Sequence, residues 1–310
     1  MLGAPSRVLR EALRLRADVY HFHDPELLPV GLILKSIGRR VVYDMHEDLP
    51  KSILGKSYLP RWLLRPLSVI TRVVERGVSR MFDLIVLARD DIQASVGEIE
   101  HTLLIRNYPK RELFASGERV ERADGEFVVA YVGGLTPGRG AVELIEAMAL
   151  VPERCRARLV IYGKFWPENL EARLRSMPGF RKVDYRGWVD HDTIPGELAR
   201  ADAGVVCFLP EPNHVNAGPT KLFEYMAAAL PVVASDFPIW RAVIEGNDCG
   251  ICVNPSEPRE IAAALEYLAD HRERGTAMGA NGRRAVLTEY NWEVEAERLV
   301  EAYRGLTSTR

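Results

Sequence analysis

The feature that most constrains the fold is a regular alternation of short apolar runs with amphipathic helical segments, which begins near Asp18 and continues to about residue 253. This alternation is typical of βαβ units, which build parallel sheets with helices on both faces. The run from Phe127 to Val132 is apolar at every position, as expected for a strand that is covered on both sides. The sequence therefore predicts an α/β protein with doubly wound parallel sheets.

The number of predicted strands indicates two domains, and 310 residues with 47% in the hydrophobic set are enough for two cores. The first domain has fewer strands than the roughly five or six of a complete doubly wound sheet, so we expect its front piece to be absent. We predict a first domain at 1–114, a linker at 115–125, a second domain at 126–290 and a C-terminal segment at 291–310. The predicted strands are 18–23, 40–45, 84–88 and 102–106 in the first domain and 126–132, 157–162, 183–185, 203–208, 232–235 and 250–253 in the second.

The most informative segment for chemistry is 213–226, which passes from the end of a predicted strand into a helix. Pro219 suits the first turn of a helix, and Gly218 before it leaves the N–H groups of that turn open to an anion such as a diphosphate. Lys221 and Glu224 share one helix face, so the lysine can neutralise phosphate while the glutamate accepts hydrogen bonds from a ribose. The alternative is an ordinary surface Lys–Glu pair. The position after a parallel strand, where ligands bind in open α/β sheets, favours the ligand site.

A second phosphate site is predicted in the turn 133–140, which follows the apolar run. Its glycines let the backbone approach a phosphate, and Arg139 supplies a planar guanidinium with a permanent charge. The glycines lack the G-x-G-x-x-G spacing of a dinucleotide fingerprint, so the sequence gives no support for a nicotinamide cofactor.

These segments resemble the donor-site signature of glycosyltransferase family 4. The similar segments are 219–227, 231–236, 131–135 with Arg139 and Gly140, 144–147, 291–303, 21–26 and 42–47. The resemblance covers nearly the whole chain. It implies a GT-B architecture, in which two Rossmann-like domains face a cleft, the N-terminal one being incomplete here and the C-terminal helix folding back onto it.

The family's motifs imply roles for individual residues of the second domain. Glu224 stands where the family binds the nucleotide ribose, and Asn216 replaces the glutamate that contacts the donor sugar. Arg139 takes the place of a phosphate-binding lysine. Gly134 stands where many members have a second basic residue, which leaves Lys164 as a substitute.

In the first domain, His46 matches a cleft histidine that contacts the donor sugar near the reacting carbon. By the resemblance, closure of the two domains would bring it over the donor. The expected catalytic residues are thus His46 and Asn216. The expected donor-binding residues are Gly133, Gly134, Arg139, Lys164, Trp188, Val189, Gly218, Pro219, Thr220, Lys221, Leu222 and Glu224.

The resemblance implies transfer of a sugar from a nucleoside diphosphate, UDP or GDP, to a hydroxyl of a glycan or lipid-linked acceptor, with retention of configuration. No cofactor is expected. Two alternatives remain open at this point. One is a sugar-nucleotide 2-epimerase of the same architecture, and the other is a shortened protein that binds a nucleotide or a partner without turnover.

Histidines in the first domain raise the question of a metal. His21 and His23 are two residues apart and face one side of a strand, and with His46 they are conceivable ligands. Polar side chains at the ends of adjacent strands are better explained by the cleft itself, and no spaced cysteine or carboxylate completes a tetrahedral set. The sequence therefore predicts no metal site.

Charge patterning bears on partners and location. The net charge of −2 gives no support for nucleic acid binding, whereas 51–80 combines seven basic residues with apolar and aromatic ones, which suits either an anionic membrane surface or a solvated crossover helix. Four cysteines within apolar runs favour a reducing compartment, and no signal peptide core is evident at the start of the chain. We expect a cytoplasmic protein associated with the inner face of the cell membrane.

Overall fold

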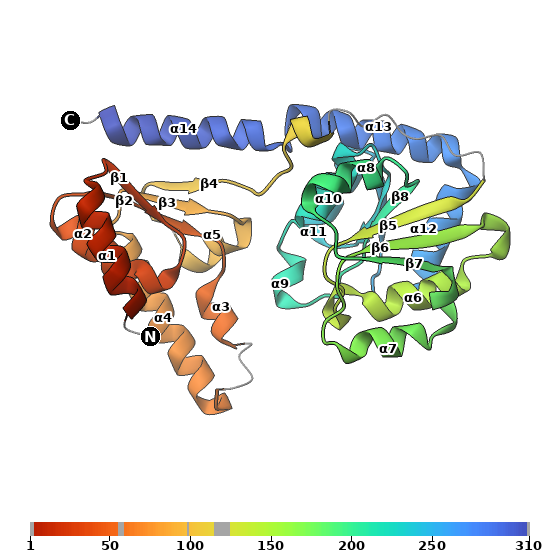
Figure 1. Cartoon of the computed structure of the whole chain (residues 1–310), viewed down its shortest axis with the longest axis horizontal. Helices are drawn as coiled ribbons and strands as arrows, with labels where there is room; N and C mark the ends of the chain where they lie inside the picture. Colours follow the sequence, from red (N-terminus) through yellow and green to blue (C-terminus); the bar gives the residue numbers. More distant parts are fainter. Residues whose placement is uncertain (1–2, 55–58, 98, 115–124, 309–310) are drawn as a thin grey trace. The chain divides into compact units, whose positions relative to one another are not determined.

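The computed structural model describes residues 3–54, 59–97, 99–114 and 125–308, which form two compact units (Figure 1). The first unit comprises 1–107 and 295–310, and the second comprises 108–294. The division follows Asn107 because the ring of Tyr108 packs against Phe223 and Tyr290 of the second unit. Apart from Gly125, the predicted linker at 115–125 lies outside the described residues.

The first unit has, in its described part, a parallel sheet in the order β1-β2-β3-β4. Aromatic packing secures the register of the first two strands, since Phe22 pairs with Tyr43 and their rings stack at 5.0 Å. The strands are β1 (Val19–Phe22), β2 (Arg40–Met45), β3 (Leu84–Leu87) and β4 (Thr102–Leu104). The helices are α1 (Gly3–Leu15), α2 (Leu28–Ser36), α3 (Leu49–Leu54), α4 (Arg61–Ser79), α5 (Asp90–Val96) and α14 (Trp292–Ser308).

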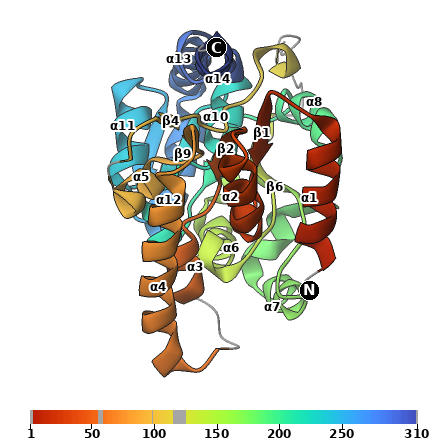
Figure 2. The ribbon, with the colours of Figure 1, turned by 90° about the vertical axis from the view of Figure 1, so that its left-hand side faces the viewer.

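Helices cover both faces of this sheet. Ala12 of α1 and Leu34 of α2 join Tyr43 and Ile85 in the apolar core of one face. On the other face, Tyr303 of α14 bonds to His21 of β1. Figures 1 and 2 show that α4 is packed beside α3 and runs on well beyond the sheet.

The second unit has six described parallel strands in the order β10-β9-β8-β5-β6-β7. This is the doubly wound order of a Rossmann-like fold, and it reverses direction between β5 and β8. The strands are β5 (Phe127–Val132), β6 (Ala157–Tyr162), β7 (Val183–Gly187), β8 (Ala203–Val206), β9 (Val232–Ser235) and β10 (Gly250–Val253). The helices are α6 (Ala141–Leu150), α7 (Asn169–Arg175), α8 (Ile194–Leu198), α9 (Pro212–Val215), α10 (Thr220–Ala227), α11 (Pro238–Gly246), α12 (Pro258–Asp270) and α13 (Arg272–Thr288).

Each strand of the second unit feeds two apolar cores, one on each face of the sheet. In β5, Val129 and Tyr131 face the core that includes α6 and α12, while Val128 and Ala130 face the core that includes α10 and α11. This alternation explains why the strand is apolar at every position. The predicted α/β class with two parallel-sheet domains is confirmed, although β8 ends at Val206, two residues earlier than predicted.

Candidate functional site

The reversal of strand order in the second unit places a crevice-forming turn at the carboxyl end of β5. The turn begins with Gly133 and ends at Gly140, where α6 starts. Gly133 has φ +110°, and a Cβ built on it would lie 3.0 Å from the Nζ of Lys221. Gly140 has φ +71°, and its Cβ would lie 1.9 Å from the carbonyl oxygen of Cys207. Both positions favour glycine because φ is positive, and at Gly140 the backbone of Cys207 also leaves no space for a side chain.

Lys221 lies next to this turn and is buried, which is unusual for a lysine. Its side chain extends from α10 to the ring of Tyr131, with Nζ 4.1 Å from the ring centre, and lies 5.1 Å from that of Phe208. The residue is only 9% exposed, and Nζ has no hydrogen-bond partner among the described residues. Burial, aided by the nearby charge of Arg139, lowers the pKa of Lys221 to about 7, against the opposing effect of Glu224.

Arg139 places a second cation next to Lys221. Its Nη1 donates to the carbonyl oxygen of Gly134 at 3.0 Å, and its guanidinium lies 5.6 Å from the ring centre of Phe208. The hydroxyl of Thr136 accepts the N–H of Arg139 and fixes the backbone of the turn. Arg139 and Lys221 are thus two cations held in fixed positions, and Lys221 has no hydrogen bond within the described residues. Together they form a site that favours an anion such as a phosphate.

Glu224 supplies a hydrogen-bond acceptor to the site, and its contact with His191 was not predicted from the sequence. The residue is 6% exposed, and its Oε1 lies 2.8 Å from the Nε2 of His191, which follows β7. The signal available was position alone, because His191 comes shortly after the carboxyl end of a parallel strand.

The start of α10 differs in detail from the sequence prediction. Pro219 caps the helix, which begins at Thr220. Gly218 and Thr220 are exposed, but the side chain of Leu222 lies in the core and its N–H donates to the carbonyl oxygen of Pro219 at 3.0 Å. Because Tyr225 accepts the N–H of Val132 at 2.9 Å, the helix is held against the end of β5.

The remaining predicted residues lie around this cluster or apart from it. Lys164 has an exposed side chain, and its carbonyl oxygen accepts the N–H of Leu135 at 2.8 Å, next to the glycine turn. Trp188 is 64% exposed, and Val189 packs at the edge of a core. Asn216 is exposed at the end of α9, and its side chain makes no hydrogen bond within the described part of the chain.

His46 belongs to the first unit, where it follows β2. Its Nε2 lies 3.0 Å from the Nδ1 of His23 and 3.3 Å from Oδ1 of Asp44. The structure therefore gathers His46 with the other polar groups at the carboxyl ends of β1 and β2. Asp44 lay inside a segment noted in the sequence, but no role was inferred for it.

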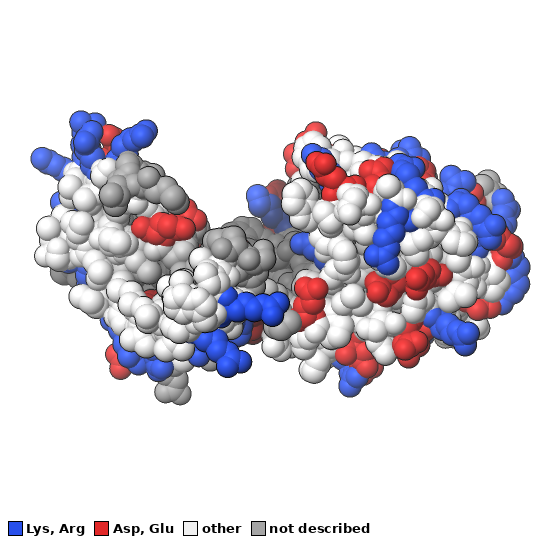
Figure 3. Space-filling view, turned by 90° about the horizontal axis from the view of Figure 1, so that it is seen from below, with Lys and Arg blue, Asp and Glu red and all other residues white. Residues whose placement is uncertain are grey.

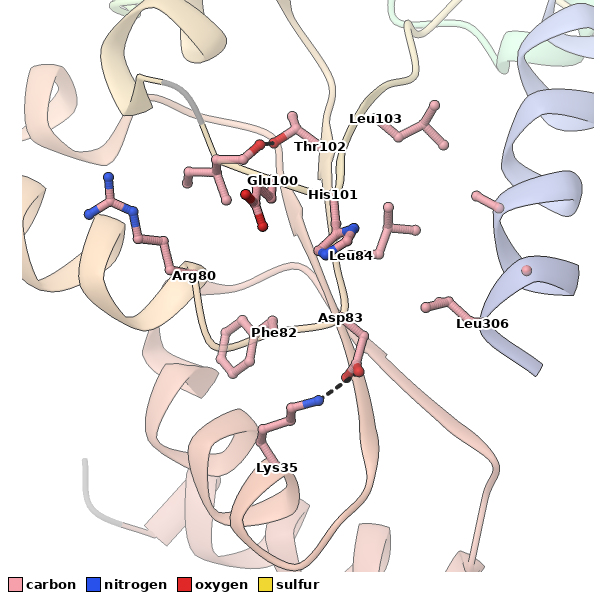
Figure 4. A pocket seen from close by; sticks show the side chains of 13 residues that line it. Lys35, Arg80, Phe82, Asp83, Leu84, Glu100, His101, Thr102, Leu103 and Leu306 are labelled. Atoms are coloured by element: carbon pink, nitrogen blue, oxygen red, sulfur yellow. Dashed lines mark hydrogen bonds and ion pairs between the residues drawn. The ribbon is translucent and has the colours of Figure 1, made fainter. Parts of the chain in front are cut away.

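A separate cavity of about 1130 Å³ opens at the other end of the first sheet (Figure 4). Asp83 and His101, which line it, precede β3 and β4, and Lys35 pairs with Asp83 at 2.6 Å. Ligands of open α/β sheets bind at the carboxyl ends of strands, so this cavity is not the candidate active site.

Comparisons with known proteins agree with this geometry. Residues 126–271 match the family described as "Glycosyl transferases group 1". An uncharacterised glycosyltransferase of Methanocaldococcus jannaschii is 28% identical over 301 residues, which cover 93% of this chain and 75% of that protein. The phosphatidyl-myo-inositol mannosyltransferase of Mycobacterium leprae is 26% identical over 315 residues, covering 98% of this chain and 78% of that protein.

Solved structures show the same fold. A sucrose-phosphate synthase from Thermosynechococcus elongatus superposes with a TM-score of 0.78 at 20% identity, over 98% of this chain and 78% of that chain. Anabaena HepE in complex with UDP gives a TM-score of 0.76 at 19% identity, over 97% of this chain and 82% of that chain. The resemblance inferred from the sequence is confirmed: residues 126–271 form a glycosyltransferase group 1 domain, and the chain has the GT-B fold.

Proposed function

Since residues 126–271 match a glycosyltransferase family, we propose that the chain transfers a sugar from a nucleoside diphosphate to a hydroxyl group, with retention of configuration and without a metal ion at the diphosphate. The observation that carries the proposal is the buried Lys221, whose Nζ has no hydrogen-bond partner among the described residues and lies beside the glycine turn at the switch point. A buried cation without an anion is costly, and a diphosphate supplies the anion.

The leaving group is the centre of the proposed mechanism. When the anomeric bond breaks, negative charge develops on the diphosphate, and groups fixed in advance around it lower the barrier most. Arg139 and Lys221 are held by Gly134 and the aromatic rings before any ligand arrives. The exposed backbone at Gly218 and Thr220 adds the N-terminus of α10, and Lys164 approaches from the neighbouring strand end.

The nucleoside is assigned to the part of the site where Glu224 lies. In the proposal, Glu224 accepts hydrogen bonds from the ribose diol, and His191 either shares the carboxylate or turns away when the ribose binds. The exposed ring of Trp188, next to Val189, provides a surface for the base. HepE, a protein of the same fold, has been solved with UDP and with UDP-glucose, which supports a nucleotide-sugar donor. UDP and GDP are both compatible with this arrangement.

Sugar and acceptor contacts complete the proposal. Asn216 stands in for the glutamate of the family motif, and its amide can hydrogen-bond a sugar hydroxyl. His46 keeps the role implied by the resemblance, contact with the donor sugar. Relatives named as phosphatidyl-myo-inositol mannosyltransferases support a glycan or lipid-linked acceptor.

We also propose that α4 holds the enzyme on the inner face of the membrane. No helix in the described residues is long and apolar enough to span a bilayer. The helix α4 is instead turned so that apolar residues face outward: Trp62 is 76% exposed and Val73 66%, whereas Ser68 and Glu75 are buried. Figure 3 shows a first unit whose visible surface is largely uncharged, with Lys and Arg and smaller patches of Asp and Glu between the uncharged areas. An outward apolar face beside exposed arginines is the pattern of a helix lying on an anionic membrane.

The donor site is tested by calorimetric titration of the full chain with UDP, GDP and ADP. We expect one of the first two to bind at micromolar concentration, and Glu224→Ala to weaken that binding by at least about tenfold, or 1.4 kcal/mol. Glu245→Ala, a change at an exposed position of α11, is the matched control and should bind as the wild type does. If folded protein bound none of the three nucleotides, the proposed donor site would be wrong.

Membrane contact is tested by sedimentation with phosphatidylserine-containing and with purely phosphatidylcholine vesicles. The chain should sediment with the anionic vesicles, and Val73→Asp should abolish this. Leu150→Asp places the same charge at a position of the second unit that is 50% exposed, and it should leave vesicle binding unchanged. Equal sedimentation of Val73→Asp and wild type would rule out α4 as the contact.

A further inference from the structure

The carboxyl ends of β1 and β2 bring three imidazoles and one carboxylate to a single point in the first unit. His21 is paired with Val42 and Phe22 with Tyr43, so the next residues along, His23 and Asp44, also lie opposite each other. Residues two apart on a strand face the same side, which places His21, His23 and Asp44 on one face of the sheet. The sequence predicts no carboxylate beside these histidines, whereas in the structure Asp44 lies next to them.

Two of the three ligand-atom separations match those around a small cation, and the third, between the two imidazoles, is no greater than 4.8 Å. The Nε2 of His21 and the Nδ1 of His23 each lie 3.3 Å from Oδ2 of Asp44. One ligand atom from each of these three residues falls within 4.8 Å of the other two. Around zinc, ligand distances of about 2.0–2.2 Å in a tetrahedron separate neighbouring ligand atoms by roughly 3.3–3.6 Å.

Neighbouring groups prepare these atoms to bind a cation. The Nδ1 of His21 bonds to the hydroxyl of Tyr303 on α14, so that its Nε2 is left to face Asp44. A hydrogen bond of this kind to the second ring nitrogen orients most metal-bound histidines. Oδ1 of Asp44 is buried and accepts no hydrogen bond within the described residues, and the side chain is 13% exposed.

We propose that His21, His23 and Asp44 bind a divalent transition-metal ion of the zinc class, with Tyr303 as the positioning residue for His21. Imidazole nitrogens with one carboxylate oxygen are a ligand set that suits zinc and its neighbours, whereas calcium and magnesium prefer oxygen alone. His46 lies beside this set, with its Nε2 3.0 Å from the Nδ1 of His23 and 3.3 Å from Oδ1 of Asp44, and is the candidate for the fourth ligand. A fourth protein ligand completes the tetrahedron that zinc prefers.

The proposed metal site is independent of the proposed glycosyl transfer. The ligands all lie in the first unit, while Arg139, Lys221 and Glu224 lie in the second, and the ion has no part in neutralising the diphosphate. The alternative explanation is that Asp44 and the imidazoles are held together by shared protons alone. A measurement of metal binding distinguishes this explanation from a metal site.

The test uses the full chain, freed of metal by chelator and dialysed, with Zn²⁺ alone as the titrant in calorimetry. We expect one ion per chain. His23→Ala and Asp44→Asn should each abolish binding, and Tyr303→Phe should weaken it by roughly 10- to 100-fold. His271→Ala is the matched control, because this histidine is exposed at the end of α12 in the second unit and should be dispensable.

Cobalt provides a readout that does not depend on variants folding. Co²⁺ in place of zinc should give the visible absorption of a four- or five-coordinate ion without a thiolate charge-transfer band, because all four cysteines lie in the second unit. Absence of stoichiometric Zn²⁺ binding, a thiolate band with Co²⁺, or undiminished binding by a folded Asp44→Asn variant would each overturn the proposal.

Discussion

Replacement of Lys221 by methionine should stabilise the second unit while weakening its binding of nucleoside diphosphates. Burial lowers the pKa of Lys221 from 10.5 to about 7. At 1.36 kcal/mol for each pKa unit, the charged form is disfavoured by about 5 kcal/mol. The charged side chain lies against the rings of Tyr131 and Phe208. We therefore expect Lys221→Met to raise the free energy of unfolding by up to about 5 kcal/mol below pH 7.

The pH dependence identifies the cause of the stabilisation. Between pH 7 and pH 10.5 the unfolded chain binds more protons at Lys221 than the folded chain, so this residue makes the wild type more stable as the pH rises. The stability advantage of Lys221→Met should shrink by about 3 kcal/mol between pH 6 and pH 9. Because the comparison is between two proteins at each pH, the titration of groups that do not interact with Lys221 cancels.

The assay is urea denaturation of the full chain at both pH values, followed by tryptophan fluorescence. Four of the five tryptophans lie in the second unit, so the signal reports mainly on that unit. Lys164→Met removes an exposed lysine near the same strand ends and should show no pH-dependent difference from the wild type. A stability difference between Lys221→Met and wild type that is the same at pH 6 and pH 9 would refute the buried ammonium, and undiminished UDP or GDP binding would refute its role at the diphosphate.

Other residues give predictions of the same kind. Gly140→Ala should destabilise the second unit by roughly 2–4 kcal/mol in urea denaturation, because its Cβ would meet the carbonyl oxygen of Cys207 in a left-handed conformation. Gly196→Ala, with open space around it in α8, should instead be neutral or stabilising by up to about 1 kcal/mol, and equal losses in the two variants would contradict the close approach. Burial raises the pKa of Glu75 above its ordinary 4.5, so this residue makes the folded state less stable as the pH rises through the raised pKa. Glu75→Gln should flatten that fall in thermal unfolding of the first unit, and a pH profile identical to the wild type would show that Glu75 ionises as freely as an exposed carboxyl.

The predictability of the fold follows from how its strands are buried. A parallel strand covered on both faces must be apolar along its length, and β5 and β8 are recognisable for that reason without knowledge of their neighbours. The orientation of α4 was not predictable in the same way. Ser68 is buried because its hydroxyl donates to the carbonyl oxygen of Pro50, and Glu75 because it accepts from Tyr43. Both partners come from other elements, so the helix sequence alone does not show which face turns inward.

In the candidate sites, too, contacts within one element were predictable from the sequence and contacts between elements were not. Lys221 and Glu224 share a helix face at a spacing of three, a relation that sequence shows directly. His191 lies 33 residues before Glu224, and its contact depends on the course of the chain after β7. The pairing of His23 with Asp44 depends on the register between β1 and β2, which a single sequence does not specify. Contacts that depend on strand register were therefore not predictable from the sequence, whereas the shared face of Lys221 and Glu224 on one helix was.

The desolvation that makes Lys221 unfavourable to bury also strengthens its electrostatic interaction with a diphosphate. A solvent-exposed lysine is screened by water and salt and interacts weakly with phosphate, whereas a desolvated ammonium interacts strongly because the effective dielectric constant is low. The energy that desolvates Lys221 is supplied when the chain folds, by the apolar cores around β5 and α10, rather than when the ligand binds. Arg139 lowers the pKa of Lys221 further, so each cation makes the other more unfavourable until an anion arrives. The unpaired charges of Lys221 and Arg139 thus lower the stability of the second unit at the place where the diphosphate binds. The negative charge of the departing diphosphate compensates these charges, and this compensation adds to its binding.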